Sequence, residues 1–360
     1  AAEDVKWFPE WGKDRLQSMV KERADWCISR QRKWGVPIPV VYCQDCGKEI
    51  IDNDIMMKVS KIFGEEGSDA WFAHDTEYFL PEGFKCPHCG SAKGFDKEKD
   101  IMDVWFDSGS SHAAVCARRK YLKVPADVYL EGADQYRGWF QSSLLTSVAG
   151  GHGAPYKQII THGWTVDGEG KKMSKSLGNG IAPQEIISKY GADILRLWVA
   201  SADYHADIRI SPEILKQISD NYRKLRNTAR YCLSNLYDFD PDKDMVSNDE
   251  LEELDKYALM KLDEVIKIAR DAFEVYDYHT AAHSLHNFCV VEMSNFYFDV
   301  LKDRLYTSAP QSKTRRAAQT VLYKVLDALT LVLTPILAFT ADEIWQSMPH
   351  DKSRNGESPL

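Results

Sequence analysis

The sequence predicts an α/β region followed by an all-α region, and three observations support this fold class. Short apolar strands alternate with helices in the first half of the 360-residue chain, in the order typical of a doubly wound sheet. Apolar residues at helical spacing dominate the chain beyond Pro212. Four of the eight cysteines form two Cys-x-x-Cys pairs around a polar segment, which predicts a small metal-binding insertion.

Composition and charge exclude several classes of protein. A hydrophobic content of 44% and a charged content of 28% exclude a disordered or fibrous chain. The formal net charge of −9 argues against a protein that coats nucleic acid non-specifically. The longest apolar stretch, residues 325–339, contains Asp327 and Pro335 and is too short to cross a bilayer. No signal segment opens the chain, so we expect a cytoplasmic protein without a membrane partner.

The first hundred residues predict a helix, a strand and an insertion. Apolar spacing favours a helix over residues 16–28, with Asp25 as an internal N-cap and Gly35 as terminator. Residues 36–42 predict a buried strand with prolines at its start, and residues 43–100 predict the insertion. The chain opens without Met and neither end carries a capped element, so we expect a piece of a longer protein.

Parallel-sheet order continues after the insertion. Residues 127–130 predict a strand, and Asp134 can cap a helix that runs to Val148. Residues 158–166 predict the next strand. Since ligands bind at the carboxyl ends of strands in such sheets, the sequence directs attention to Glu131 and His162.

The remainder predicts helices. Pro183 opens a short helix that ends at Gly191, and a second helix covers residues 192–201. Three long amphipathic helices follow, over residues 251–273, 285–300 and 321–345. The polar segment 238–248 links the bundle to what precedes it.

The sharpest local signal is the string Lys171–Asn179, which reads KKMSKSLGN. Lysines supply point charges for phosphate, serines and exposed amides donate hydrogen bonds, and glycine lets the loop move. The string resembles the KMSKS signature of the class I aminoacyl-tRNA synthetases letter for letter. A surface loop of lysine, glycine and serine without that full string would be more simply explained as a solvated loop.

Further blocks extend the resemblance over essentially the whole chain. Residues 25–32 resemble the return from an editing insertion into the catalytic domain in the isoleucine, valine and leucine enzymes. Residues 103–109 form another block of this family, and residues 131–140 are similar to the bacterial-type isoleucine enzymes in particular. Residues 191–198 and 341–345 fit as well.

The resemblance implies a domain order. We expect residues 1–42 to return from the editing domain, residues 43–100 to form the insertion with zinc knuckles, and residues 101–180 to form the second half of a class I Rossmann-type catalytic domain. Residues 181–215 would be connecting helices, and residues 216–360 a truncated anticodon-binding helix bundle. The His-Ile-Gly-His signature and the editing domain are absent from the sequence.

The resemblance also implies site residues. Lys172 and Lys175 would be catalytic. The adenylate and ATP would contact a larger set, namely Glu131, Gly132, Asp134, Gln135, His162, Gly163 and Lys175. Trp105 and Trp139 would wall the isoleucine side chain. On the residues alone, Asp134 is also a helix cap, His162 a buried structural histidine and both tryptophans core residues.

Cys43, Cys46, Cys86 and Cys89 suit a structural Zn²⁺ ion bound by four thiolates. The 39 residues between the pairs exceed the common ribbon spacing, and four unrelated buried cysteines remain the alternative. His88 is an unfavourable replacement ligand.

Function follows from the resemblance. It implies ATP-dependent activation of isoleucine, with Mg²⁺, and transfer to tRNA(Ile) by a monomer, of which this chain is a partial and inactive fragment. The alternatives are a fragment of a valyl- or leucyl-tRNA synthetase, or a non-catalytic RNA-binding module when isolated.

Overall fold

The computed structural model describes residues 1–174, 176–354 and 358–359. The chain divides into two compact units, Ala1–Thr161 and His162–Leu360. Each unit contains buried apolar clusters of its own. Among the described residues, no helix is long and apolar enough to span a membrane.

A three-stranded sheet organises the first unit. The strand order is β1 (Lys6–Phe8), β8 (Gln158–His162) and β7 (Tyr129–Gly132), with β1 parallel to β8. Three helices accompany this sheet: α1 (Trp11–Lys21), α5 (Val104–Gly109) and α6 (Trp139–Ala149). Apolar residues of β1, α1 and α6 share one buried cluster with Tyr136, which is fully buried. That cluster holds the end of β7, and the residues after it, in a fixed place.

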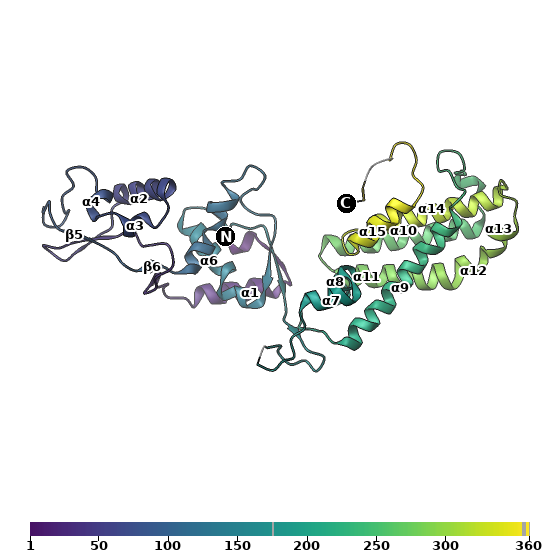
Figure 1. The fold of residues 1–360 in the computed structure, drawn as a ribbon, viewed down its shortest axis with the longest axis horizontal. Helices are drawn as coiled ribbons and strands as arrows, with labels where there is room; N and C mark the ends of the chain where they lie inside the picture. The colour runs from purple at the N-terminus through teal and green to yellow at the C-terminus, as the bar shows by residue number, and fades with distance from the viewer. Residues whose placement is uncertain (175, 355–357, 360) are drawn as a thin grey trace. The chain divides into compact units, whose positions relative to one another are not determined.

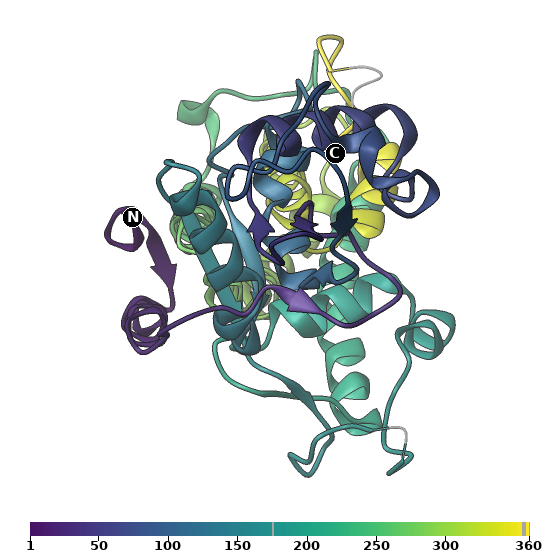
Figure 2. The same cartoon turned by 90° about the vertical axis from the view of Figure 1, so that its left-hand side faces the viewer.

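The insertion forms its own small layer of sheet and helices (Figure 1, Figure 2). Its antiparallel sheet has the order β4 (Glu49–Ile50), β3 (Val41–Cys43), β5 (Phe95–Lys97). Helices α2 (Asn53–Glu66), α3 (Ala70–Ala73) and α4 (Thr76–Phe79) lie beside it and share a buried cluster with the strands. The antiparallel pair β2 (Ser29–Arg30) and β6 (Ile101–Met102) joins the two ends of the insertion.

The second unit begins with a short parallel pair, β9 (Thr165–Val166) and β10 (Ile208–Arg209). All of its longer elements are helices (Figure 1). They are α7 (Pro183–Tyr190), α8 (Ala192–Ala200), α9 (Pro212–Asn235), α10 (Glu253–Glu274), α11 (Tyr278–Asn287), α12 (Phe298–Val300), α13 (Lys302–Thr307), α14 (Lys313–Leu333) and α15 (Ala338–Ser347), with a π-helix at Phe288–Tyr297. One large apolar cluster runs through this bundle. The predicted all-α region is therefore confirmed.

Two predicted elements of the first unit are shorter than expected. Helix α1 ends at Lys21, and Asp25 starts no new helix. The segment that follows is held by side chains instead, since Trp26 donates a 2.9 Å hydrogen bond to the Asp103 carboxylate. Only the end of the predicted strand 36–42 is a strand, because Pro37 and Pro39 have no N–H group to donate to a ladder.

Three other predictions merged elements that the chain separates. The helix expected from Asp134 is a 3-10 turn, Ala133–Arg137, that precedes α6, and Gly138 divides the two. The expected strand 158–166 is two strands, β8 and β9, with Gly163 between them. The expected helix 321–345 is α14 and α15, because a proline at 335 cannot continue the hydrogen-bonded ladder.

Candidate functional site

The strip after strand β7 places its polar side chains in a connected order. Gln135 donates to the Asp134 carboxylate at 2.8 Å, and its own amide oxygen accepts the backbone N–H of Trp139 at 3.0 Å. Asp134 is exposed and caps no helix. Glu131 is exposed near the end of β7, and its side chain makes no hydrogen bond with any residue that the structure describes. The strip therefore offers carboxylates for hydroxyl groups beside an amide of fixed orientation.

The two predicted pocket tryptophans lie at one end of this strip. Trp105, on α5, is 39% exposed, and its ring lies 3.0 Å from the point where a Cβ on Gly138 would stand. The same Cβ would lie 2.4 Å from the side-chain oxygen of Gln135, so only glycine fits at position 138. Trp139 directly follows. The chain thus brings the polar strip and both tryptophans together.

Trp139 is held by three contacts. Its ring stacks on Tyr129 with centroids 4.0 Å apart and planes 8° apart. Its Nε1 donates to the Ser108 carbonyl at 3.0 Å and to the Ser111 hydroxyl at 3.2 Å. These contacts give the half-buried Trp139 a structural role, whereas Trp105 presents part of its ring to solvent.

His162 is the last residue of strand β8, and Gly163 follows it. The Nδ1 of His162 lies 2.8 Å from the Gly163 carbonyl oxygen, and the ring is only partly buried, so it is not a core histidine. A Cβ on Gly163 would lie 2.4 Å from the backbone of Ala206. Glycine is required there because two stretches of backbone meet, and the Gly163 N–H donates to the Tyr204 carbonyl at 2.9 Å.

The lysine-rich loop lies in the second unit and follows β9. Lys172 is exposed and bridges to Val166 through the backbone, while Met173 is partly buried against the apolar cluster of the bundle. Lys175, predicted to be catalytic, lies outside the described residues. Asn179, which sequence reasoning did not single out, closes this loop with three side-chain hydrogen bonds.

The four cysteines of the insertion converge. The Sγ atoms of Cys43, Cys46, Cys86 and Cys89 all lie within 4.8 Å of one another, with Cys43 to Cys89 at 3.7 Å and Cys46 to Cys86 at 3.8 Å. A tetrahedron of thiolates around zinc, with Zn–S bonds of about 2.3 Å, has edges of about 3.8 Å. The observed separations match those edges, so these four thiols can hold one metal ion.

Backbone donors favour ionisation of one thiol of the cluster, Cys86, whereas burial and the neighbouring thiols raise the pKa of Cys46 and of Cys89. Burial opposes ionisation of the Cys86 thiol, but the N–H groups of His88 and Cys89 outweigh it and lower its pKa to about 6. The His88 N–H lies 3.4 Å from the sulfur, while its ring contacts the Glu49 carbonyl instead of the cluster.

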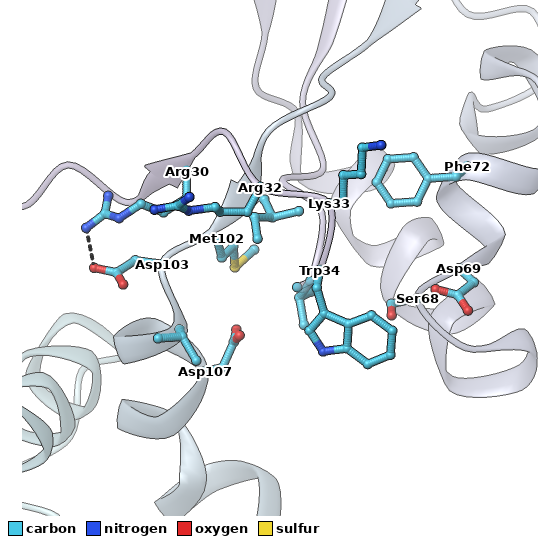
Figure 3. Close-up of a pocket in the computed structure, with 14 residues that line it drawn as sticks. Arg30, Arg32, Lys33, Trp34, Ser68, Asp69, Phe72, Met102, Asp103 and Asp107 are labelled. Carbon is cyan, nitrogen blue, oxygen red and sulfur yellow. Dashed lines mark hydrogen bonds and ion pairs between the residues drawn. The ribbon is translucent and has the colours of Figure 1, made fainter. Parts of the chain in front are cut away.

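A cavity of about 620 Å³ lies where the insertion joins α5, and sequence reasoning missed it. Figure 3 shows the Trp34 ring, 94% exposed, projecting between Asp107 and Ser68. Arg32 and Lys33 also line the cavity, and neither makes an ion pair with any described residue. The adjacent residues Arg32, Lys33 and Trp34 were the signal in the sequence that could have indicated this site. The three walls of the cavity, however, come from distant parts of the sequence.

Two acidic residues on the same wall differ in environment. Asp103 accepts a 2.7 Å hydrogen bond from Arg30, with which it forms an ion pair. Burial, and then the nearby Asp103 carboxylate, raise the pKa of Asp107. The cavity therefore combines an exposed aromatic face, two free cations and a carboxyl group, a set suited to an unpaired nucleotide.

Comparison with known proteins gives two family matches. Residues 1–211 match the family of tRNA synthetases class I (I, L, M and V), and residues 255–359 match the anticodon-binding domain of tRNA ligase. The chain is 59% identical over 358 residues to an isoleucine–tRNA ligase of Caldanaerobacter subterraneus subsp. tengcongensis, and 58% identical over 355 residues to that of Natranaerobius thermophilus. Each alignment covers 99% of this chain but only 38% of the relative.

Solved structures show a similar fold. A methionyl-tRNA synthetase of Mycobacterium tuberculosis in complex with methionyl-adenylate has a TM-score of 0.68 at 19% identity, covering 98% of this chain and 60% of that chain. A ternary complex of the Agrobacterium radiobacter K84 agnB2 LeuRS with tRNA and LeuAMS has a TM-score of 0.65 at 21% identity, covering 91% and 41%. At these identities the likeness concerns the fold alone.

Proposed function

Because the chain belongs to the class I tRNA synthetases of the isoleucine, leucine, methionine and valine group, we propose that it serves ATP-dependent attachment of isoleucine to tRNA(Ile). One observation carries the proposal. The Gln135 side chain bonds both the Asp134 carboxylate and the backbone N–H of Trp139, and Trp105 lies beside Gly138 between them. An aminoacyl-adenylate needs both surfaces, since its ribose is polar and the isoleucine side chain is apolar. The 59% identity to isoleucine–tRNA ligases favours isoleucine over valine or leucine.

The proposed roles follow from position. Glu131, Gly132, Asp134 and Gln135 would bind the ribose and backbone of the adenylate, with His162 and Gly163 on the adenine side. Lys172 and Lys175 would stabilise negative charge on the phosphates of ATP as pyrophosphate leaves. Mg²⁺ would accompany the ATP as part of the substrate.

A structural role for zinc is also part of the proposal. The Cys43–Cys46 and Cys86–Cys89 pairs would bind one Zn²⁺ ion and tie the two ends of the insertion together. The edge lengths of the sulfur cluster support zinc, because four thiolates in tetrahedral array are the ligands it prefers.

The RNA partner is supported by two surfaces. The match of residues 255–359 to an anticodon-binding domain supports binding of tRNA by the helical bundle. In the first unit, the cavity around Trp34 supports contact with an unpaired nucleotide through stacking and through Arg32 and Lys33. A non-catalytic RNA-binding role would use the same surfaces without the adenylate strip.

Binding of adenylate analogues tests the proposal. Non-hydrolysable sulfamoyl analogues of isoleucyl-, valyl- and leucyl-adenylate are titrated into the 360-residue chain and followed by calorimetry. We expect the isoleucyl analogue to bind most tightly and Gln135→Ala to weaken it, because that variant releases both Asp134 and Trp139. Gln17→Ala, which removes only a 2.6 Å hydrogen bond to Glu3, is the matched control. Equal binding of all three analogues, or RNA binding without any analogue binding, would contradict the proposal.

A further inference from the structure

Asn179 spans the lysine-rich loop with every polar atom of its side chain. Its Oδ1 accepts the backbone N–H of Ser174 at 3.0 Å. Its Nδ2 donates to the Asp167 carboxylate at 2.8 Å and to the Lys172 carbonyl at 3.3 Å. A side-chain amide has two N–H donors and one carbonyl acceptor, so Asn179 is fully used in holding this loop together.

Asp167 is itself fixed before it meets Asn179. It directly follows strand β9, and its Oδ1 accepts the backbone N–H groups of Glu169 at 3.0 Å and Lys171 at 2.8 Å. The Oδ2 atom of Asp167 therefore remains available to accept the hydrogen bond from Asn179. The Asn179 amide, and then the Lys171 N–H, lower the pKa of Asp167, so the carboxylate is charged at neutral pH.

These contacts hold the backbone at Lys172 and Ser174 and leave the Lys172 side chain without an ion pair among the described residues. Lys172 bridges to Val166 of β9, and Met173 packs against the apolar cluster of the bundle. The side chain of Lys172 is exposed and forms no ion pair with any described residue, whereas Lys171 pairs with Glu169 at 2.6 Å. Lys172 is therefore the described lysine of this loop that is available to an anion.

We propose that Asn179 and Asp167 are positioning residues, which hold the Lys172–Ser174 backbone so that the Lys172 ammonium group meets the polyphosphate of ATP at a fixed reach. The inference rests on the proposed function, since it takes ATP as the ligand. A cation whose backbone is already fixed stabilises phosphate charge without first having to be ordered. Neither residue touches the ligand in this arrangement, because both act through the loop.

Two measurements on the 360-residue chain test the pair. Amide hydrogen exchange reports the Ser174 N–H, and an NMR titration with Mg·ATP reports binding at the loop. Asn179→Ala should speed exchange at Ser174 by about tenfold, the change expected when a hydrogen bond in a charge-assisted network is lost. The same variant should weaken ATP binding. Gln184→Ala, at an exposed position of α7 beyond the loop, is the control and should change neither.

Swapping the two side chains tests whether the loop contacts can be restored. Asn179→Asp alone places two carboxylates side by side, so the protection of the Ser174 N–H, taken relative to its intrinsic exchange rate at each pH, should be lost at neutral pH and return in acid, where one carboxyl group takes a proton. Combining it with Asp167→Asn restores one carboxylate and one amide. The double variant should recover this protection at neutral pH and regain most of the ATP affinity.

The outcomes separate the inference from the proposed function. Faster exchange at Ser174 with unchanged ATP affinity would overturn the inference, because the pair would then only stabilise the fold. Failure of the double variant to recover either property would overturn it too. Replacing Lys172 and Lys175 together by alanine removes both lysines assigned to phosphate and leaves Asn179 in place, so if ATP affinity survives that change, the loop is no phosphate site and the proposed function fails on its own account.

Discussion

At the scale of single residues, the two tryptophans that the sequence treats alike have different surroundings. Trp139 is stacked on Tyr129 and makes two hydrogen bonds, whereas Trp105 is 39% exposed. Amino-acid selection and stability can therefore be tested on separate side chains. The proposed pocket would gain only about 1–3 kcal/mol from one methylene, a magnitude established for this enzyme family.

Trp105→Ala should erode the preference for the isoleucyl analogue over the leucyl analogue while changing the free energy of unfolding by less than about 1 kcal/mol. Trp139→Ala should erode this preference and should also lower the free energy of unfolding by about 3 kcal/mol, since it removes a half-buried, stacked ring. Thermal denaturation beside calorimetric titration of both analogues separates the effects. An unchanged preference in Trp105→Ala would remove this residue from the pocket.

Asp238 gives the stability of the bundle a defined dependence on pH. It accepts hydrogen bonds from Arg315 at 2.5 and 3.0 Å and from Gln319 at 2.8 Å. The Arg315 hydrogen bonds, followed by that of Gln319, outweigh burial and lower the pKa of Asp238. A carboxyl group with a lowered folded pKa stabilises the fold above its unfolded pKa, about 3.9, and loses that contribution as pH falls through the folded value.

Asp238→Asn should therefore lower the free energy of unfolding by about 3 kcal/mol at pH 7, because it leaves the buried Arg315 guanidinium without its counter-charge. The difference between variant and parent should shrink as pH falls below about 4. Urea denaturation at a series of pH values measures this. Asp242→Asn, at an exposed neighbouring position, is the control, and a difference that stays constant with pH would refute the assignment.

Residue identities could be predicted from sequence where chemistry dictates spacing. The four cysteines converge as their paired spacing indicates, because each Cys-x-x-Cys turn brings two sulfur atoms close together. The role of Asn179 could not be predicted, since its three bonds depend on a loop path that no spacing rule describes. Trp34 was missed for a similar reason: its cavity needs walls from three separate segments.

At the scale of elements, residues 191–198, which the sequence marks only by their resemblance to the family, connect helix α8 to helix α15 through hydrogen bonds. Asp193 on α8 is buried and accepts both the backbone N–H of Thr340, at 2.7 Å, and its hydroxyl, at 2.5 Å. Thr340 lies in the first turn of α15, which has no side-chain cap of its own. Arg196 on the same helix donates to the carbonyl groups of Ile336 and Pro335 at 2.8 and 2.7 Å.

Asp193→Ala should lower the free energy of unfolding by about 2 kcal/mol, because it leaves the Thr340 N–H and hydroxyl buried without an acceptor. Asp193→Asn keeps a carbonyl oxygen at the same place and should recover about half of that loss. Urea denaturation of the two variants gives the comparison. Equal losses in both would show that charge rather than hydrogen bonding to α15 is what matters.

Helices were predicted more accurately than strands, for a physical reason. The 3.6-residue period of α7, α8 and α10 is visible over two or more turns, so their limits follow from caps and glycines. The strands of the first unit have two to five residues, too few to establish alternation. Breaks at Gly138 and Gly163 come from close approach of distant atoms, which no local pattern contains.

At the scale of the whole molecule, the two units contain separate cores. The apolar clusters of the first unit draw on the sheet and on the insertion, whereas that of the second unit begins at Ile186 and is almost entirely helical. Each unit should therefore unfold on its own. The proposed metal belongs to the first unit alone, which gives a way to distinguish the two transitions.

Chelation should lower the melting temperature of one calorimetric transition and leave the other in place. Elemental analysis should first find about one zinc per chain, and a chelator or Cys86→Ser should remove it. Cys232→Ser changes a buried cysteine of the second unit, so it should lower the melting temperature of the transition that chelation leaves in place. A chain without zinc whose insertion resists protease as well as before would contradict the proposed metal site.

The sulfur cluster also has a consequence in an oxidising environment. All eight cysteines are free thiols, and the pairs Cys43–Cys89 and Cys46–Cys86 lie 3.7 and 3.8 Å apart, against a disulfide bond of about 2.05 Å. Only a small movement separates these thiols from covalent pairing, and Cys89 is exposed to reagents. A bound metal would keep these thiols from being oxidised to disulfides. Loss of that metal under oxidative stress would let disulfides form in its place, and the insertion would then need a reductant before it could be reloaded.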